Sequence, residues 1–195
     1  MKYFLFIESV KTKEWEVGAI IENDIKFNPD YEDVRTCHVK ITNCIELKEV
    51  LVEFKEVVKI EDYAIIHIDA HSNETELGFR NDPNLKDMYN KQSWDDVVKM
   101  CDSLFEKYNG SALFVFASCL SALYFKEQPS PSFSVIAAEN EVDPHRMEEQ
   151  LLVFYNSFCS GNSFEQAYNE MIQRFPIEEE LTRDEKKQSV LRFYK

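Results

Sequence analysis

Two apolar runs of the sequence each end in a side chain that can take part in covalent chemistry. The run 63–71 ends in His71, and the run 112–119 ends in Cys119. A thiol becomes a strong nucleophile once a base removes its proton, and an imidazole can take that proton and later give it to a leaving amine. If the two side chains meet, the pair is equipped to cleave an amide through a thioester.

Both runs have the composition of buried parallel strands, because they are rich in Ile, Val and Phe and are bounded by turn or polar residues. Neighbouring parallel strands lie about 4.8 Å apart, so a His and a Cys at the ends of two neighbours come within reach of each other. In open α/β sheets this edge, at the carboxyl ends of the strands, is where chemistry takes place. The N–H groups of Ser72 and Cys119 are the natural donors to an acyl oxyanion.

The rest of the chain supplies the elements that must hold this edge in place. The order of strand and helix signals favours right-handed crossovers, and therefore an α/β domain over 1–195 with a mostly parallel sheet of about six strands flanked by helices. We expect loops at 22–35 and at 72–92, the latter a loop or short hairpin over the site. Further strands are expected at 2–8, 15–22 (a hairpin through 11–14), 37–42, 133–138 and 190–195, the last as an edge strand, and helices at 47–58, 93–108, 120–126, 144–161 and 163–175.

Composition restricts the possible partners. The chain has 195 residues and a formal net charge of −14, which argues against a nucleic-acid or anionic-membrane surface and favours basic partners or uncharged ones. The first residues lack a signal peptide and no stretch has the length of a membrane span, so we expect a cytoplasmic protein. The five cysteines are odd in number and include no C-x-x-C pair, which favours free, mostly buried thiols. We expect no cofactor and no resident metal ion.

Longer motifs around the two strand ends resemble a known family. Residues 67–74 read His-x-x-x-His-small-Asn-Glu, and residues 116–122 read Phe-Ala-Ser-Cys-Leu-Ser-Ala. Together with the aromatic, Gly and Ala pattern of 154–167, they resemble the caspase-like cysteine peptidases, especially the bacterial CHAT branch, in order and spacing over about residues 60–175. The resemblance implies a caspase-like three-layer sandwich.

The same resemblance implies a function. It makes His71 the general base and acid and Cys119 the nucleophile of a cysteine endopeptidase. It further implies a regulated effector of bacterial defence or programmed cell death, which cuts a protein substrate once a sensor protein or an assembly step activates it. The loop 72–92 is then the segment expected to move.

One residue departs from the family pattern. The family usually has Gly directly after the catalytic His, and this chain has Ser72. If that position needs a positive φ, Ser72 is strained and the oxyanion hole is imperfect. The alternative function is therefore an inactive caspase-like pseudopeptidase that acts as a binding or regulatory module.

Acidic residues near the strand ends suggest a substrate preference. Carboxylates in the first substrate pocket would select Lys or Arg before the cut bond. The available carboxylates are those of Asp69, Glu139, Glu141 and Asp143.

A second alternative uses the first strand end differently. His67, Asp69 and His71 have a spacing suited to metal ligands, and the stretch resembles the first metal motif of ureohydrolases. That family needs an Asp where this chain has Asn73, and the chain is short for the fold. We expect instead that His67, on the strand face of Asp69 and His71, is a hydrogen-bonded core histidine. The other two histidines, His38 and His145, are expected at the surface, and the remaining cysteines are expected to be packing residues: Cys37, Cys44, Cys101 and Cys159.

Overall fold

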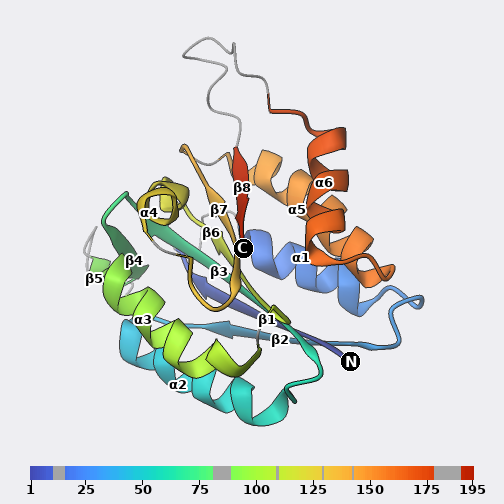
Figure 1. Ribbon diagram of the computed structural model, residues 1–195, viewed down its shortest axis with the longest axis horizontal. Helices are drawn as coiled ribbons and strands as arrows, with labels where there is room; N and C mark the ends of the chain where they lie inside the picture. The colour runs from blue at the N-terminus through green and yellow to red at the C-terminus, as the bar shows by residue number, and fades with distance from the viewer. Residues whose placement is uncertain (11–15, 81–88, 109, 129, 142, 178–189) are drawn as a thin grey trace.

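The computed structural model describes residues 1–10, 16–80, 89–108, 110–128, 130–141, 143–177 and 190–195. In this part of the chain, a mostly parallel eight-stranded sheet lies between two layers of helices (Figure 1). This arrangement confirms the predicted α/β three-layer fold class. The strands are β1 (Lys2–Ser9), β2 (Val34–Lys40), β3 (Tyr63–Ser72), β4 (Glu76–Arg80), β5 (Tyr89–Ser93), β6 (Ala112–Ala117), β7 (Ser134–Ala138) and β8 (Leu191–Tyr194). The helices are α1 (Val17–Lys26), α2 (Cys44–Val57), α3 (Trp94–Phe105), α4 (Ser121–Glu127), α5 (Pro144–Cys159) and α6 (Phe164–Arg174), with a short 3₁₀ helix η1 (Glu106–Tyr108) after α3.

The strand order of the main sheet is β2-β1-β3-β6-β7-β8. Its first five strands are parallel, and β8 is antiparallel to β7, which confirms an edge strand near the end of the sequence. Because β3 and β6 are parallel neighbours, their carboxyl ends meet at one edge of the sheet. Strands β4 and β5 form an antiparallel hairpin on the last residues of β3, within the segment where a loop or short hairpin was predicted; residues 81–88 of that segment lie outside the described residues.

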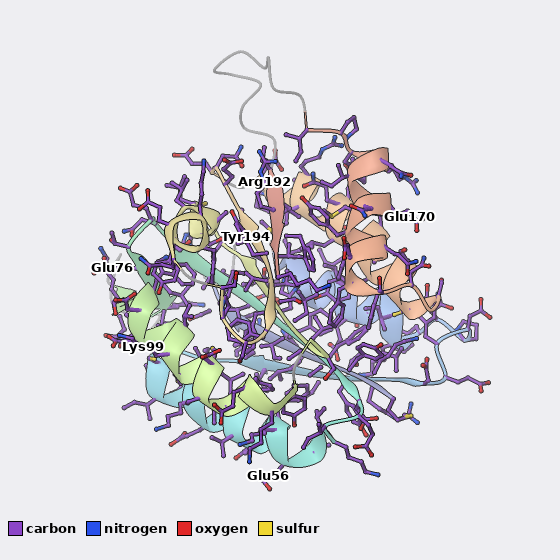
Figure 2. The ribbon with its side chains drawn as sticks, in the orientation of Figure 1. Glu56, Glu76, Lys99, Glu170, Arg192 and Tyr194 are labelled. Carbon is purple, nitrogen blue, oxygen red and sulfur yellow. The ribbon has the colours of Figure 1, made fainter. Side chains whose placement is uncertain are left out.

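Each face of the sheet has its own helix layer. Helices α2, α3 and α4 cover one face and α1, α5 and α6 cover the other (Figure 1). The side chains between these layers are mostly large and apolar, and charged side chains such as Glu56, Glu76 and Glu170 point outwards on different sides of the molecule (Figure 2). In the described part of the chain, no helix is both long enough and apolar enough to cross a bilayer.

Several helices begin where the sequence predicts, because their first N–H groups have local side-chain acceptors. Ser93 accepts a hydrogen bond from Asp96 N–H at the start of α3, and Asp143 accepts from His145 and Arg146 N–H at the start of α5. A complete capping box between Ser163 and Gln166 begins α6. These caps confirm the predicted helix starts.

The predicted strand at 15–22 is wrong, because residues 17–22 belong to helix α1 and residue 15 lies outside the described residues. Val17, Ile21 and Ile25 are buried at intervals of four residues, which is the pattern of a helix face. A short apolar run does not by itself distinguish a strand from a helix. Helix α1 and the early start of β2 also shorten the predicted loop 22–35, and the predicted turn at 11–14 lies outside the described residues.

Candidate active site

The two strand ends predicted to carry the chemistry lie side by side. Asp69 of β3 pairs with Ala117, the last residue of β6, so His71 and Cys119 each follow this last pair by two residues, His71 within β3 and Cys119 in the turn after β6. The Ser72 hydroxyl donates a hydrogen bond to the Cys119 carbonyl oxygen, which joins the two ends directly. His71 is exposed and Cys119 is half-buried, so both residues are accessible to solvent at this edge.

The backbone of Ser72 is extended and is not strained by a positive φ, because Ser72 is the last residue of β3 and pairs with Leu77 of β4. Asn73 N–H donates to Glu76 O at 3.0 Å, which makes the adjacent Ser72–Leu77 pair a non-hydrogen-bonded pair of the antiparallel ladder. In such a pair the N–H groups point away from the partner strand. The Ser72 N–H therefore points away from β4, towards the side of β3 on which Cys119 lies.

The backbone turns sharply directly after Cys119. Leu120 has φ 58° and ψ 10°, and it is the only non-glycine residue with a positive φ in the described part of the chain. This conformation costs an L-residue about 1–2 kcal/mol. Leu120 N–H donates to Asn140 O at 3.1 Å, and Ser121 Oγ donates to Ser118 O at 2.9 Å, so the turn is held by specific bonds. Backbone strain of this kind is concentrated at functional sites.

Sequence reasoning missed two residues that hold this turn. Asn140 accepts from Leu120 N–H through its carbonyl oxygen and from Val190 N–H, at 2.9 Å, through its side chain. Ser121 accepts from Ala138 N–H at 3.0 Å. Both residues tie the turn to β7 and β8, and nothing in their local sequence distinguishes them from ordinary turn residues.

Asp69 and His67 lie in a buried hydrogen-bonded column beneath the edge. The His67 ring contacts Asp69 Oδ1 through Nε2 and the Tyr155 hydroxyl through Nδ1, each at 3.0 Å, and Gly18 N–H donates to Asp69 Oδ2 at 2.6 Å. Burial, followed by the negative charge of Asp69, raises the pKa of Tyr155 well above its ordinary value, so the hydroxyl keeps its proton. The prediction that His67 is a hydrogen-bonded core residue is confirmed.

The same column weakens the metal-site alternative. Both ring nitrogens of His67 are engaged by protein groups, so neither is directed at an open coordination position. Among the residues that the structure describes, no group of three or more His, Cys, Asp or Glu side chains is arranged to hold a metal ion.

The four carboxylates predicted to bind substrate differ in accessibility. Asp69 is 3% exposed and engaged at both oxygens, so it does not face a substrate pocket. Glu139 accepts from two nitrogens of Arg192 at 2.7 Å, and Asp143 caps α5. Glu141 is exposed.

Two depressions lie near the strand ends. A small one of about 130 Å³ is lined by His71, Ser72, Asn73, Glu76, Gly78 and Lys91. A larger groove of about 750 Å³ lies between the β3–β4 turn, the start of α3 and α4, the helix that follows Cys119. Its charged lining residues are three carboxylates and one lysine: Glu74, Asp95, Glu127 and Lys126.

Two predictions about the other cysteines and histidines of the chain need correction. All five cysteines are free thiols, but Cys37 is exposed, not buried, because it lines an open groove between its edge strand and α2. His38, expected at the surface, is partly buried, and its Nε2 lies 3.1 Å from the buried carboxylate of Glu8. His145 is exposed, as predicted.

No protein-family model and no curated protein matches the chain. Its function must therefore be inferred from the geometry of its own residues.

Proposed function

We propose that this chain is a cysteine endopeptidase of the caspase-like type, in which Cys119 is the nucleophile and His71 is the general base and acid. The observation that carries the proposal is the contact between the two strand ends, where the Ser72 hydroxyl bonds to the Cys119 carbonyl and the last strand pair, Asp69 with Ala117, lies two residues before His71 and Cys119. The strained turn at Leu120 supports it, because the strain lies directly beside the proposed nucleophile.

The residues at this edge supply each step of peptide hydrolysis. His71 takes the thiol proton of Cys119, the thiolate attacks the carbonyl carbon, and the N–H groups of Ser72 and Cys119 bind the resulting oxyanion. As the oxyanion collapses, the C–N bond breaks and the amine leaves with the proton from His71. Water then attacks the thioester, giving its proton to His71, and releases the carboxylic acid and the Cys119 thiol.

The charge near the site supports a basic substrate residue before the cut bond. The groove beside the strand ends holds more carboxylates than cationic side chains, and Glu141 is exposed beyond β7. Lys or Arg would complement this charge, in keeping with a net charge of −14 for the chain. Such an enzyme would serve as an effector in bacterial defence or programmed death, and its partners would be a protein substrate and an activating sensor protein or assembly.

The reactivity of Cys119 tests the catalytic pair without any knowledge of the substrate or activator. Cys37 is a reference thiol in the same chain: the residue is exposed, and partial desolvation of its sulfur, followed by the charge of Glu22, raises its pKa. We expect iodoacetamide at pH 7 to alkylate Cys119 at least about 10-fold faster than Cys37, and His71→Ala to remove this advantage. Peptide mass spectrometry of timed samples measures both rates.

Peptide cleavage tests the full activity. Fluorogenic peptides with Lys or Arg before the bond should be cut, and Cys119→Ala should lower the rate at least about 10³-fold while Cys37→Ala leaves it unchanged. Cleavage after Asp would contradict the basic preference. Alkylation of Cys119 that is no faster than that of Cys37 and is insensitive to His71→Ala would contradict the catalytic pair and favour a binding module.

A further inference from the structure

Two buried carboxylates lie in register on the central strands and differ in one respect that matters for the site. Glu8 of β1 pairs with Asp69 of β3, and their side chains are 2% and 3% exposed. Both accept an N–H from the first turn of α1: Ala19 N–H donates to Glu8 at 3.0 Å and Gly18 N–H to Asp69 at 2.6 Å. Only Asp69 lies on the strand that carries His71.

Asp69 is held more tightly than an ordinary core carboxylate. One oxygen faces the His67 ring and the other accepts from Gly18 N–H, and the far side of the His67 ring meets the Tyr155 hydroxyl. A Cβ at position 18 would lie 3.0 Å from Asp69 Oδ2, so α1 approaches this closely because residue 18 is a glycine. These contacts link three elements: α1 bonds to Asp69 of β3, Asp69 contacts His67 of the same strand, and His67 contacts Tyr155 of α5.

The charge of Asp69 lies close to the proposed base. Alternate residues of a strand share a face, so Asp69 and His71 are on the same face, about 6.6 Å apart along β3. Gly18 N–H, at the N-terminus of α1, donates to one carboxylate oxygen, and His67 Nε2 lies 3.0 Å from the other. A fixed negative charge at this distance favours the positive charge that His71 acquires when it takes the proton of Cys119.

We propose that Asp69 is a positioning residue for His71, and that its buried charge promotes the transfer of the Cys119 proton. It acts through His71 and has no contact with substrate. This inference rests on the proposed function, because it presupposes that His71 is the base of Cys119.

The test compares four variants by the rate at which iodoacetamide alkylates Cys119. Asp69→Asn removes the charge and keeps the shape, since an Asn oxygen can still accept from Gly18 N–H and its amide can donate to the other tautomer of His67. Glu8→Gln is the matched control, because it makes the same change on the neighbouring strand. Tyr155→Phe removes the hydroxyl group that contacts His67 Nδ1 and leaves the carboxylate of Asp69 in place. His71→Ala removes the proposed base.

We expect Asp69→Asn to slow the alkylation of Cys119 about 3- to 10-fold at pH 7, which a charge at this distance can produce. Glu8→Gln and Tyr155→Phe should change the rate less than about twofold, because the charge at position 69 remains. Alkylation of Cys37 in the same samples should be unchanged. Circular dichroism and the melting temperature separate this effect from a loss of folding.

The outcomes distinguish the two proposals. If His71→Ala slows alkylation and Asp69→Asn does so no more than Glu8→Gln, the positioning role is wrong and the catalytic pair stands. If His71→Ala has no effect, the catalytic pair fails and the positioning role fails with it. If Asp69→Asn does not fold, Asp69→Ser replaces it: this variant also removes the charge and leaves a smaller polar side chain, and an unchanged Cys119 rate would overturn the proposal.

Discussion

The two faces of the central strands are built from alternating residues of the same sequence and have opposite character. Towards α2, α3 and α4, β1 and β3 present apolar side chains until Ser9 at the end of β1: Leu5, Ile7, Ile66, Ile68 and Ala70. Towards α1 and α5, the same strands begin apolar and become polar and charged: Phe4, Phe6, Glu8, Ile65, His67 and Asp69. One face is a continuous hydrophobic core, and the other carries buried charge towards the candidate site.

The difference shows what a buried carboxylate needs. Burial of a charge is costly unless hydrogen bonds replace water, and the helices of the polar face supply them. The first turn of α1 gives N–H groups to Glu8 and Asp69, and α5 places the Tyr155 hydroxyl against His67. Helices α2, α3 and α4 instead contribute mainly large apolar side chains to the other face.

The largest loss of stability is expected from a substitution on the apolar face of the sheet, which packs against α2, α3 and α4. Phe114 is completely buried, and its ring contacts those of Phe105, Phe116 and Phe133. Phe114→Ala should lower the free energy of unfolding by about 3–5 kcal/mol, measured by urea denaturation. Phe27→Ala, at a side chain that is 77% exposed, is the control and should change it by less than about 0.5 kcal/mol. Similar losses for the two variants would mean that this face is not the main core.

An intermediate effect is expected where α1 meets the polar face. Gly18→Ala places a methyl group 3.0 Å from Asp69 Oδ2 and should cost about 1–2 kcal/mol of stability. The Asp69→Ala variant lacks the carboxylate that a methyl group at position 18 would contact. In this variant Gly18→Ala should stabilise the protein by about 0.5–1 kcal/mol, because Ala is a better helix former than Gly. Urea denaturation of the four proteins measures this double-mutant cycle, and a cost that persists without Asp69 would show that the close approach is not to its carboxylate.

The smallest effect concerns the charge of Glu8 and depends on pH. Burial, opposed by His38 and Lys40 and assisted by Asp69 and Glu16, raises the pKa of this carboxyl above 4.5, its ordinary value. Because the folded pKa is the higher one, the contribution of Glu8 to stability is fully present below pH 4.5 and is lost as the pH rises through the raised pKa. Glu8→Gln, which stays neutral, should therefore melt slightly above the wild type at pH 7.

That difference should disappear as the pH falls below 4.5, where Glu8 is itself neutral. Melting curves at pH 4 and pH 7 measure it. A variant that melts below the wild type at pH 7 would mean that the ion pairs of Glu8 with His38 and Lys40 outweigh its burial.

Sequence reasoning succeeded where the structural signal is local. Ser93, Asp143 and Ser163 cap helices through bonds to residues two or three positions away, so the predicted helix starts were confirmed. It failed for α1, whose helical form is favoured by the buried sheet face and by the carboxylates that accept its first N–H groups. The concern that Ser72 is strained was settled by the next strand along the chain, since β4 holds this residue in an extended ladder.

The sequence by itself determined two buried strands that lead to His71 and Cys119, although the second ends at Ala117, two residues before the cysteine; two-residue alternation and apolar composition are local properties of the chain. Only the tertiary structure decided that these strands are neighbours, that Leu120 adopts a left-handed conformation, and that Asp69 faces the core and not a substrate. The physical reason is the sequence separation of the groups involved: the bond of Asp69 to Gly18 spans 51 residues and that of His67 to Tyr155 spans 88.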